Sequence, residues 1–311
     1  MKRFLFLIAT TILLACQTAS EQNQNAYSSK KSEPSSTKLN SKKKTQAQNH
    51  PTPKHLSYSW QNTTQSNSNL INRFSPPKGF KRVHAPKGSF AEWLRYLPLQ
   101  KEGTSVKLHN GKLKWNQFVH EAIVDIDIGK ADLQQCADAV MRLKAEYHYS
   151  KKEYEKIHFN YTSGHKVSFD DWRKGKRPKV SGNSVSFQNN GKVSDAYSNF
   201  KKYLIQIFSY AGTASLTKEL KAKRIKNIAP GDVFIQGGFP GHAVLVLDVA
   251  EDEEGGRVFM IGQSYMPAQS FHVLKNKEDA GLSPWYSADV EALLETPEWT
   301  FKRGDLKEWG L

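Results

Sequence analysis

Cysteine is scarce in this sequence, with only Cys16 and Cys136 among 311 residues. After residue 16, no apolar run approaches the roughly 20 residues that a helix needs to cross a bilayer. The sequence also has no zinc-ligand spacing, no phosphate-binding loop and no Gly-x-Ser-x-Gly elbow, so we expect no metal and no cofactor. It has no nucleic-acid-binding motif either. Despite a formal charge of +15, we therefore expect no nucleic-acid partner.

The first sixteen residues, "MKRFLFLIATTILLAC", have the pattern of an export signal. Two positive charges precede a short apolar run that ends at a small residue. The end of this run, "LLAC", resembles the lipobox of bacterial lipoproteins, which implies a lipid on Cys16. An ordinary secretory signal cleaved nearby is the alternative. With the lipobox, residues 1–16 predict a protein of the bacterial cell envelope whose membrane attachment is the lipid on Cys16.

Composition divides the remainder of the chain into two parts. Residues 17–70 are dominated by Ser, Asn, Gln, Lys and Thr, which cannot bury enough apolar surface to offset the entropy of ordering. We predict a disordered tether there. From residue 71 the apolar and aromatic content stays high, and about 240 residues suffice for one sizeable domain. Residues 71–311 are therefore predicted to form one globular α+β domain.

Hydrophobic periodicity and turn residues predict the elements of this domain. Ser89 is expected to cap a short helix, Asp132 to cap a longer one that contains Cys136, and Asn110-Gly111 to form a hairpin turn. Three apolar runs near the C-terminal end are expected to form an antiparallel meander. The predicted helices are 89–97, 130–149, 195–212 and 215–222, and the predicted strands include 121–129, 232–236, 242–250 and 257–265.

If Cys16 is lipidated, Cys136 has no partner for an internal disulfide and remains a free thiol. Its predicted position near a helix start favours the thiolate, because unsatisfied amide groups point there. The alternative is a packing role, since Leu133, Cys136 and Val140 share one helix face.

His242 follows a glycine-rich segment and begins an apolar strand, "HAVLVLDVA". In a hairpin with the next strand, it is expected to lie opposite residues 263–265, where Gln263, or Ser264 in reserve, can hold the imidazole. An exposed strand-end histidine and a Gln263 that merely ends its strand are the alternatives.

Two segments resemble papain-like amidohydrolases of the NlpC/P60 and CHAP group. "QQCADAVMRLKAEY" resembles their cysteine-bearing helix start, and "PGDVFIQGGFPGHAVLVLD" resembles their turn and histidine-initiated strand. The resemblance implies a papain-like fold with the cysteine-bearing helix packed on an antiparallel sheet. It implies Cys136 as nucleophile, His242 as base, Gln263 as its orienting partner and Gln135 as oxyanion-hole donor. The long separation between Cys136 and His242 implies an inserted region within residues 155–195.

Residues 71–311 also resemble an uncharacterised family of bacterial lipoproteins, a domain of unknown function. Motifs such as "DIDIGKADLQQCADAVMRLKAEY", "PGHAVLVLD" and "TPEWTF" carry this resemblance, which implies no activity by itself.

A polar and aromatic cluster suggests where a substrate binds. Tyr161, Ser163, His165 and Trp172 fall within a short span, although Trp172 on an amphipathic helix is also a candidate core residue. The leading hypothesis is a monomeric cysteine hydrolase that cleaves amide bonds, with envelope peptides such as peptidoglycan stem peptides as substrate. The alternative is a non-catalytic lipoprotein that binds the cell wall or acts as a scaffold on the same fold.

Overall fold

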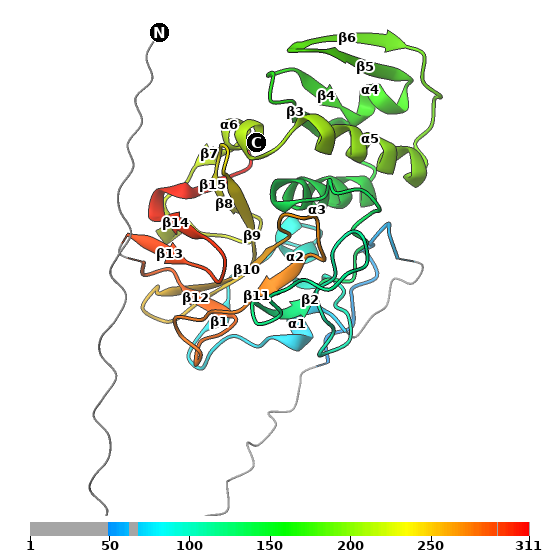
Figure 1. Cartoon of the computed structure of the whole chain (residues 1–311). Helices are drawn as coiled ribbons and strands as arrows, with labels where there is room; N and C mark the ends of the chain where they lie inside the picture. Colours follow the sequence, from blue (N-terminus) through cyan, green and yellow to red (C-terminus); the bar gives the residue numbers. More distant parts are fainter. Residues whose placement is uncertain (1–48, 62–67, 291, 311) are drawn as a thin grey trace, which may run out of the picture. The chain divides into compact units, whose positions relative to one another are not determined.

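The computed structural model describes residues 49–61, 68–290 and 292–310. Within these residues, a mainly antiparallel sheet of nine strands dominates the fold, in the order β2-β11-β10-β9-β8-β15-β7, with β1 on β9 and β12 on β10 (Figure 1). The predicted α+β class is confirmed. The strands are β1 Lys81–Arg82, β2 His120–Ile123, β7 Lys221–Ala222, β8 Val233–Gln236, β9 His242–Glu251, β10 Arg257–Gln263, β11 His272–Leu274, β12 Trp285–Ser287 and β15 Leu306–Glu308.

The predicted meander forms the centre of this sheet. β8 pairs with β9, and β9 pairs with β10, both antiparallel. The side chains of β9 alternate between two hydrophobic clusters: Ala243 and Leu245 belong to one, Val244 and Val246 to the other. The first cluster also contains residues of the helix α3, Cys136–Ser150, which packs on β9.

The other helices are α1 Leu70–Arg73, α2 Phe90–Arg95, α4 Phe169–Arg173, α5 Tyr197–Tyr210 and α6 Thr213–Glu219.

The two predicted helix caps have different outcomes. The Ser89 cap of α2 is confirmed, because its hydroxyl accepts a hydrogen bond from the Glu92 amide at 3.2 Å. The Asp132 cap is wrong, because α3 begins only at Cys136. The Asp132 carboxylate accepts instead from the Ala268 amide at 2.6 Å, a tertiary partner that local sequence does not reveal.

The N-terminal boundary of the folded part also differs from the prediction. Residues 49–61 were expected to belong to the tether, yet Leu56 and Tyr58 are buried in the core. The Tyr58 hydroxyl donates to the Trp93 carbonyl at 2.9 Å, and the two rings lie 5.0 Å apart. A few apolar and aromatic anchors in "HLSYSW" are therefore enough to order a segment whose flanks are polar.

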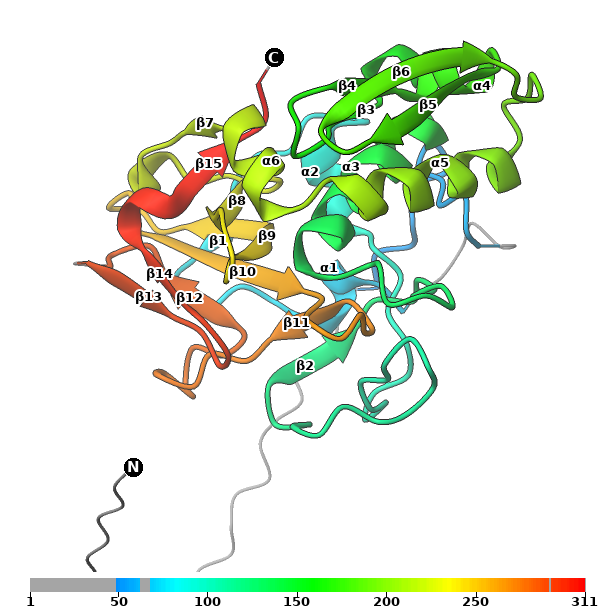
Figure 2. The same cartoon turned by 45° about the horizontal axis from the view of Figure 1, so that its top comes forward.

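The region expected to be an insertion forms two small hairpins and a short helix. β3 His158–Asn160 pairs with β4 Lys166–Ser168, and β5 Lys176–Ser181 pairs with β6 Ser184–Asn189, with α4 between them. Figures 1 and 2 show these hairpins to one side of the main sheet. A further hairpin, β13 Leu293–Glu295 with β14 Thr300–Lys302, lies near the C-terminal end of the chain.

The predicted turn at Asn110-Gly111 is present, but the two segments that it connects pair with each other only through one isolated bridge, between Lys107 and Leu113.

Among the described residues, no helix is both long enough and apolar enough to span a membrane.

Candidate functional site

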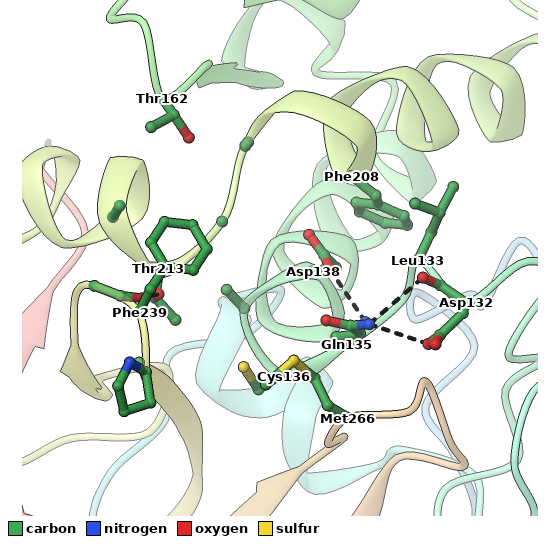
Figure 3. A pocket seen from close by; sticks show the side chains of 17 residues that line it. Asp132, Leu133, Gln135, Cys136, Asp138, Thr162, Phe208, Thr213, Phe239 and Met266 are labelled. Carbon is green, nitrogen blue, oxygen red and sulfur yellow. Dashed lines mark hydrogen bonds between the residues drawn. The ribbon is translucent and has the colours of Figure 1, made fainter. Parts of the chain in front are cut away.

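Cys136 is the first residue of α3 and lines a cavity of about 190 Å³ (Figure 3). Its free thiol is buried, with the residue 7% exposed. The opposite wall of the cavity comes from the glycine-rich segment that precedes β9, including Gly238, Phe239 and Gly241. The thiol therefore stands where a small group can approach it between the helix start and this segment.

Burial, and then the nearby Asp138, raise the pKa of the Cys136 thiol to about 11. Backbone amides of Ala137, Ala243 and Cys136 itself act in the opposite sense. Burial also raises the pKa of Asp138 well above its usual range, which favours its neutral form. A neutral Asp138 opposes thiolate formation less than a carboxylate does. Thiolate formation at neutral pH therefore calls for a base beside the sulfur.

His242 is the first residue of β9 and is 2% exposed. Its Nε2 lies 2.7 Å from Oε1 of Gln263, the last residue of β10. The rings of Tyr265, Trp299 and Phe301 surround the imidazole at 4.8, 5.3 and 5.9 Å. The contact expected between His242 and a polar residue near the end of the next strand is thus present, and it is made by Gln263.

Burial above all, together with the charge of Lys114, lowers the pKa of His242 to about 4, against the opposing effect of the Gln263 hydrogen bond. The imidazole is therefore neutral at neutral pH, which is the form that can accept a proton.

The thiol and the imidazole lie around the start of β9. The sulfur interacts with the amide of Ala243, the residue next to His242. Ala243 belongs to the cluster that contains α3, whereas the His242 ring packs against Trp299 and Phe301 of the second cluster, as the alternation along a strand predicts. Among the described residues, no hydrogen bond joins the Cys136 thiol to the His242 ring. The thiol thus contacts the backbone next to His242 but is not hydrogen-bonded to the His242 ring.

Two charged residues that the sequence analysis missed complete the environment of Gln263. Its Nε2 donates to Glu298 Oε2 at 2.8 Å, and Glu298 Oε1 lies 2.7 Å from Lys114 Nζ. Both charged side chains are largely buried, at 8% exposure for Lys114 and 14% for Glu298. "TPEWTF" contains Glu298, but no sequence signal joins it to Lys114.

Gln135, the predicted oxyanion-hole donor, also lines the cavity. Its side-chain amide is engaged, because Nε2 donates to Asp132 Oδ1 at 3.0 Å (Figure 3). The backbone amides at the start of α3 are further donors beside the sulfur.

The predicted substrate-binding cluster does not line this cavity. Tyr161 and Trp172 are buried in the core, and the Trp172 indole donates to Asn199, so burial contradicts the idea of an exposed aromatic platform. Ser163 and His165 lie on the β3–β4 turn and contact each other at 3.1 Å. Their neighbour Thr162 is the residue of this turn that reaches the cavity.

The predicted lipidation site, Cys16, lies outside the described residues. Within the described ranges, no group of three or more His, Cys, Asp or Glu side chains has an arrangement that could hold a metal ion.

The fold and the site together define an α+β domain with a free thiol at a helix start and a histidine–glutamine pair at the adjoining ends of two central strands. The chain belongs to the family described as Domain of unknown function (4846), whose sequence model matches residues 70–308. The resemblance to an uncharacterised domain family is therefore confirmed. No match was found among curated proteins or among solved structures.

Proposed function

We propose that this protein is a cysteine hydrolase that cleaves amide bonds, with Cys136 as nucleophile and His242 as base. The observation that carries the proposal is the position of the thiol: it lines a cavity and contacts the amide of Ala243, next to a histidine whose Nε2 is held by Gln263. A nucleophile, a base and a residue that orients the base are the parts that thiol catalysis requires.

In this proposal, the Cys136 sulfur attacks the carbonyl carbon of the substrate while the thiol proton passes to His242. The proton then goes to the leaving nitrogen as the C–N bond breaks, which leaves a thioester and a free amine. A water molecule attacks the thioester, gives a proton to His242, and releases the acid as the C–S bond breaks and the thiol is restored. The proton transfers require the sulfur and the ring to come within hydrogen-bond distance, so at least one of the two side chains must move from its position in the structure.

Backbone amides at the start of α3 are the donors best placed to stabilise the negative oxygen during both attacks. Gln135 can add its side-chain amide if it leaves Asp132. The papain-like arrangement, a location in the cell envelope and a lipid on Cys16 belong to the same proposal. Stem peptides of peptidoglycan supply amide bonds in that compartment.

A second function is favoured by the burial of Cys136 and the raised pKa of its thiol. A buried, protonated thiol is inert and behaves as a small core residue. In that case the domain is a non-catalytic protein that binds the cell wall, and its basic composition would favour an anionic polymer.

Release of soluble muropeptides from purified cell wall distinguishes the two functions. We expect release by the wild type and none above background by Cys136→Ala, with both proteins still folded and monomeric. If neither protein releases muropeptides and both bind sedimented cell wall equally, the result would support the non-catalytic wall-binding function. Equal release by both would exclude Cys136 as the nucleophile.

A further inference from the structure

We propose that Lys114 and Glu298 are positioning residues that fix the tautomer of His242, so that its Nδ1 carries the lone pair that accepts a proton. The catalytic meaning of this inference rests on the proposed function. The tautomer itself is a property of the resting protein and can be measured without substrate.

The inference follows from which groups can donate and which can accept. A carboxylate has only acceptor oxygens, so the Gln263 group that faces Glu298 must be its NH₂. The other end of the same amide, Oε1, then faces His242 and can only accept. His242 must therefore carry its proton on Nε2, which lies 2.7 Å from that oxygen. In a neutral imidazole, a proton on Nε2 leaves Nδ1 without one.

Lys114 supplies the charge that makes this arrangement stable. A buried carboxylate without a cation is costly, and the ammonium of Lys114 lies 2.7 Å from the Glu298 oxygen that Gln263 does not use. Lys114 Nζ also donates to Gln269 Oε1 at 3.3 Å, which anchors the ammonium to the segment between β10 and β11. Each oxygen of Glu298 thus has its own donor, and the amide of Gln263 has only one favourable orientation.

The isosteric variant Glu298→Gln makes a sharp prediction because it should reverse the chain of hydrogen bonds. Lys114 can only donate, so the new side chain should turn its oxygen toward Lys114 and its NH₂ toward Gln263. The Gln263 amide then flips to present its own oxygen to residue 298 and its NH₂ to His242. His242 must then accept at Nε2 and carry its proton on Nδ1.

Heteronuclear NMR of the ring nitrogens, with selectively labelled histidine in the full chain, tests the inference at pH 7. His242→Gln identifies the signals, and Glu308→Gln is the matched control, because Glu308 pairs with Lys223 at 3.0 Å elsewhere in the sheet. We expect Nε2–H in the wild type and in the control, and Nδ1–H in Glu298→Gln. We also expect Glu298→Gln to lose about 10²- to 10⁴-fold in hydrolysis, as for loss of a general base.

An Nδ1–H tautomer in the wild type would overturn the inference, and so would an Nε2–H tautomer that persists in a folded Glu298→Gln variant. If that variant does not fold, the wild-type tautomer alone decides. If the tautomers behave as expected and the wild type hydrolyses nothing, the proposed function fails and the positioning role stands. If hydrolysis is present and the tautomer does not respond to Glu298→Gln, the positioning role fails.

Discussion

Two buried polar residues on β9 are held in different ways. Asp248 has both carboxylate oxygens occupied by guanidinium groups, with Arg82 Nε and Arg95 Nε each at 2.6 Å. His242, six residues earlier, has one ring nitrogen bonded to Gln263, and its other nitrogen has no hydrogen-bond partner among the described residues. The Asp248 cluster is closed on itself, whereas the His242 network ends, within the described part of the chain, at a ring nitrogen that makes no hydrogen bond.

This difference separates a structural role from a candidate functional one. A closed ionic cluster satisfies its own charges and therefore contributes to folding or to specificity of packing. An open-ended network holds one group in a defined orientation and leaves an atom available for a reactant. Substitutions in the first network should change stability, and substitutions in the second should change chemistry.

The largest effect is expected at the open network. His242→Gln keeps a polar side chain that can still bond to Gln263, but it removes the only ring nitrogen able to take the thiol proton. Hydrolysis should fall by about 10²- to 10⁴-fold, the range for loss of a general base. A muropeptide-release assay measures the change, and a melting curve checks that the fold is retained. Unchanged release would remove His242 from the proposed mechanism.

The closed network should respond in stability. Asp248→Ala leaves Arg82 and Arg95 buried without their shared partner, and we expect a loss of about 3–5 kcal/mol in the free energy of unfolding. Urea denaturation followed by fluorescence measures this change. The surface pair Lys81–Glu253 is the control, because its side chains are almost fully exposed, and Glu253→Gln should have little effect. If the free energy of unfolding of Asp248→Ala fell by less than about 1 kcal/mol, the Asp248 network would not have the structural role that distinguishes it from the His242 network.

The reactivity of the thiol should depend steeply on pH. Because the pKa of Cys136 is raised to about 11, alkylation by iodoacetamide should accelerate about tenfold per pH unit between pH 7 and 9. Mass spectrometry of the peptide that contains Cys136 gives the rate. A plateau below pH 8 would instead indicate a thiolate already paired with a protonated His242 in the resting protein.

A smaller effect concerns His272, which is fully buried on β11 and lies opposite Gln263. Burial lowers its pKa to about 3, so the unfolded chain binds a proton more readily than the folded one below about pH 6.5. The stability from its neutral form is present above pH 6.5 and is lost as the pH falls toward 3. The difference in unfolding free energy between wild type and His272→Gln should therefore shrink by up to about 1.4 kcal/mol per pH unit on acidification. A difference that is constant between pH 7 and 4 would contradict this.

The elements that were predictable from sequence are those fixed by burial over many residues. The strands from Val233 to Gln263 are long apolar runs between clear turns, so periodicity alone located them and their order. The partner of His242 was also within reach, because a hairpin constrains which residues can face each other.

The features that sequence could not supply depend on contacts between distant segments. The helix α3 begins at Cys136 and is not capped by Asp132, because the Asp132 carboxylate accepts a hydrogen bond from the backbone amide of Ala268. The burial of Tyr161 and Trp172 depends on how the inserted hairpins pack. Lys114 and Glu298 lie on unrelated loops and meet only in the fold. Polar side chains carry no periodic signal, and their partners are therefore set by tertiary structure.

Capture of the acyl-enzyme tests the central claim most directly. Wild-type protein is mixed with an activated ester of a stem-peptide acid, quenched in acid, digested and examined by mass spectrometry. We predict an acyl group on the peptide that contains Cys136, with much slower labelling in His242→Gln and none at residue 136 in Cys136→Ala. Hydrolysis of the ester by the wild type without any acyl group on Cys136, or equal labelling in wild type and His242→Gln, would contradict it.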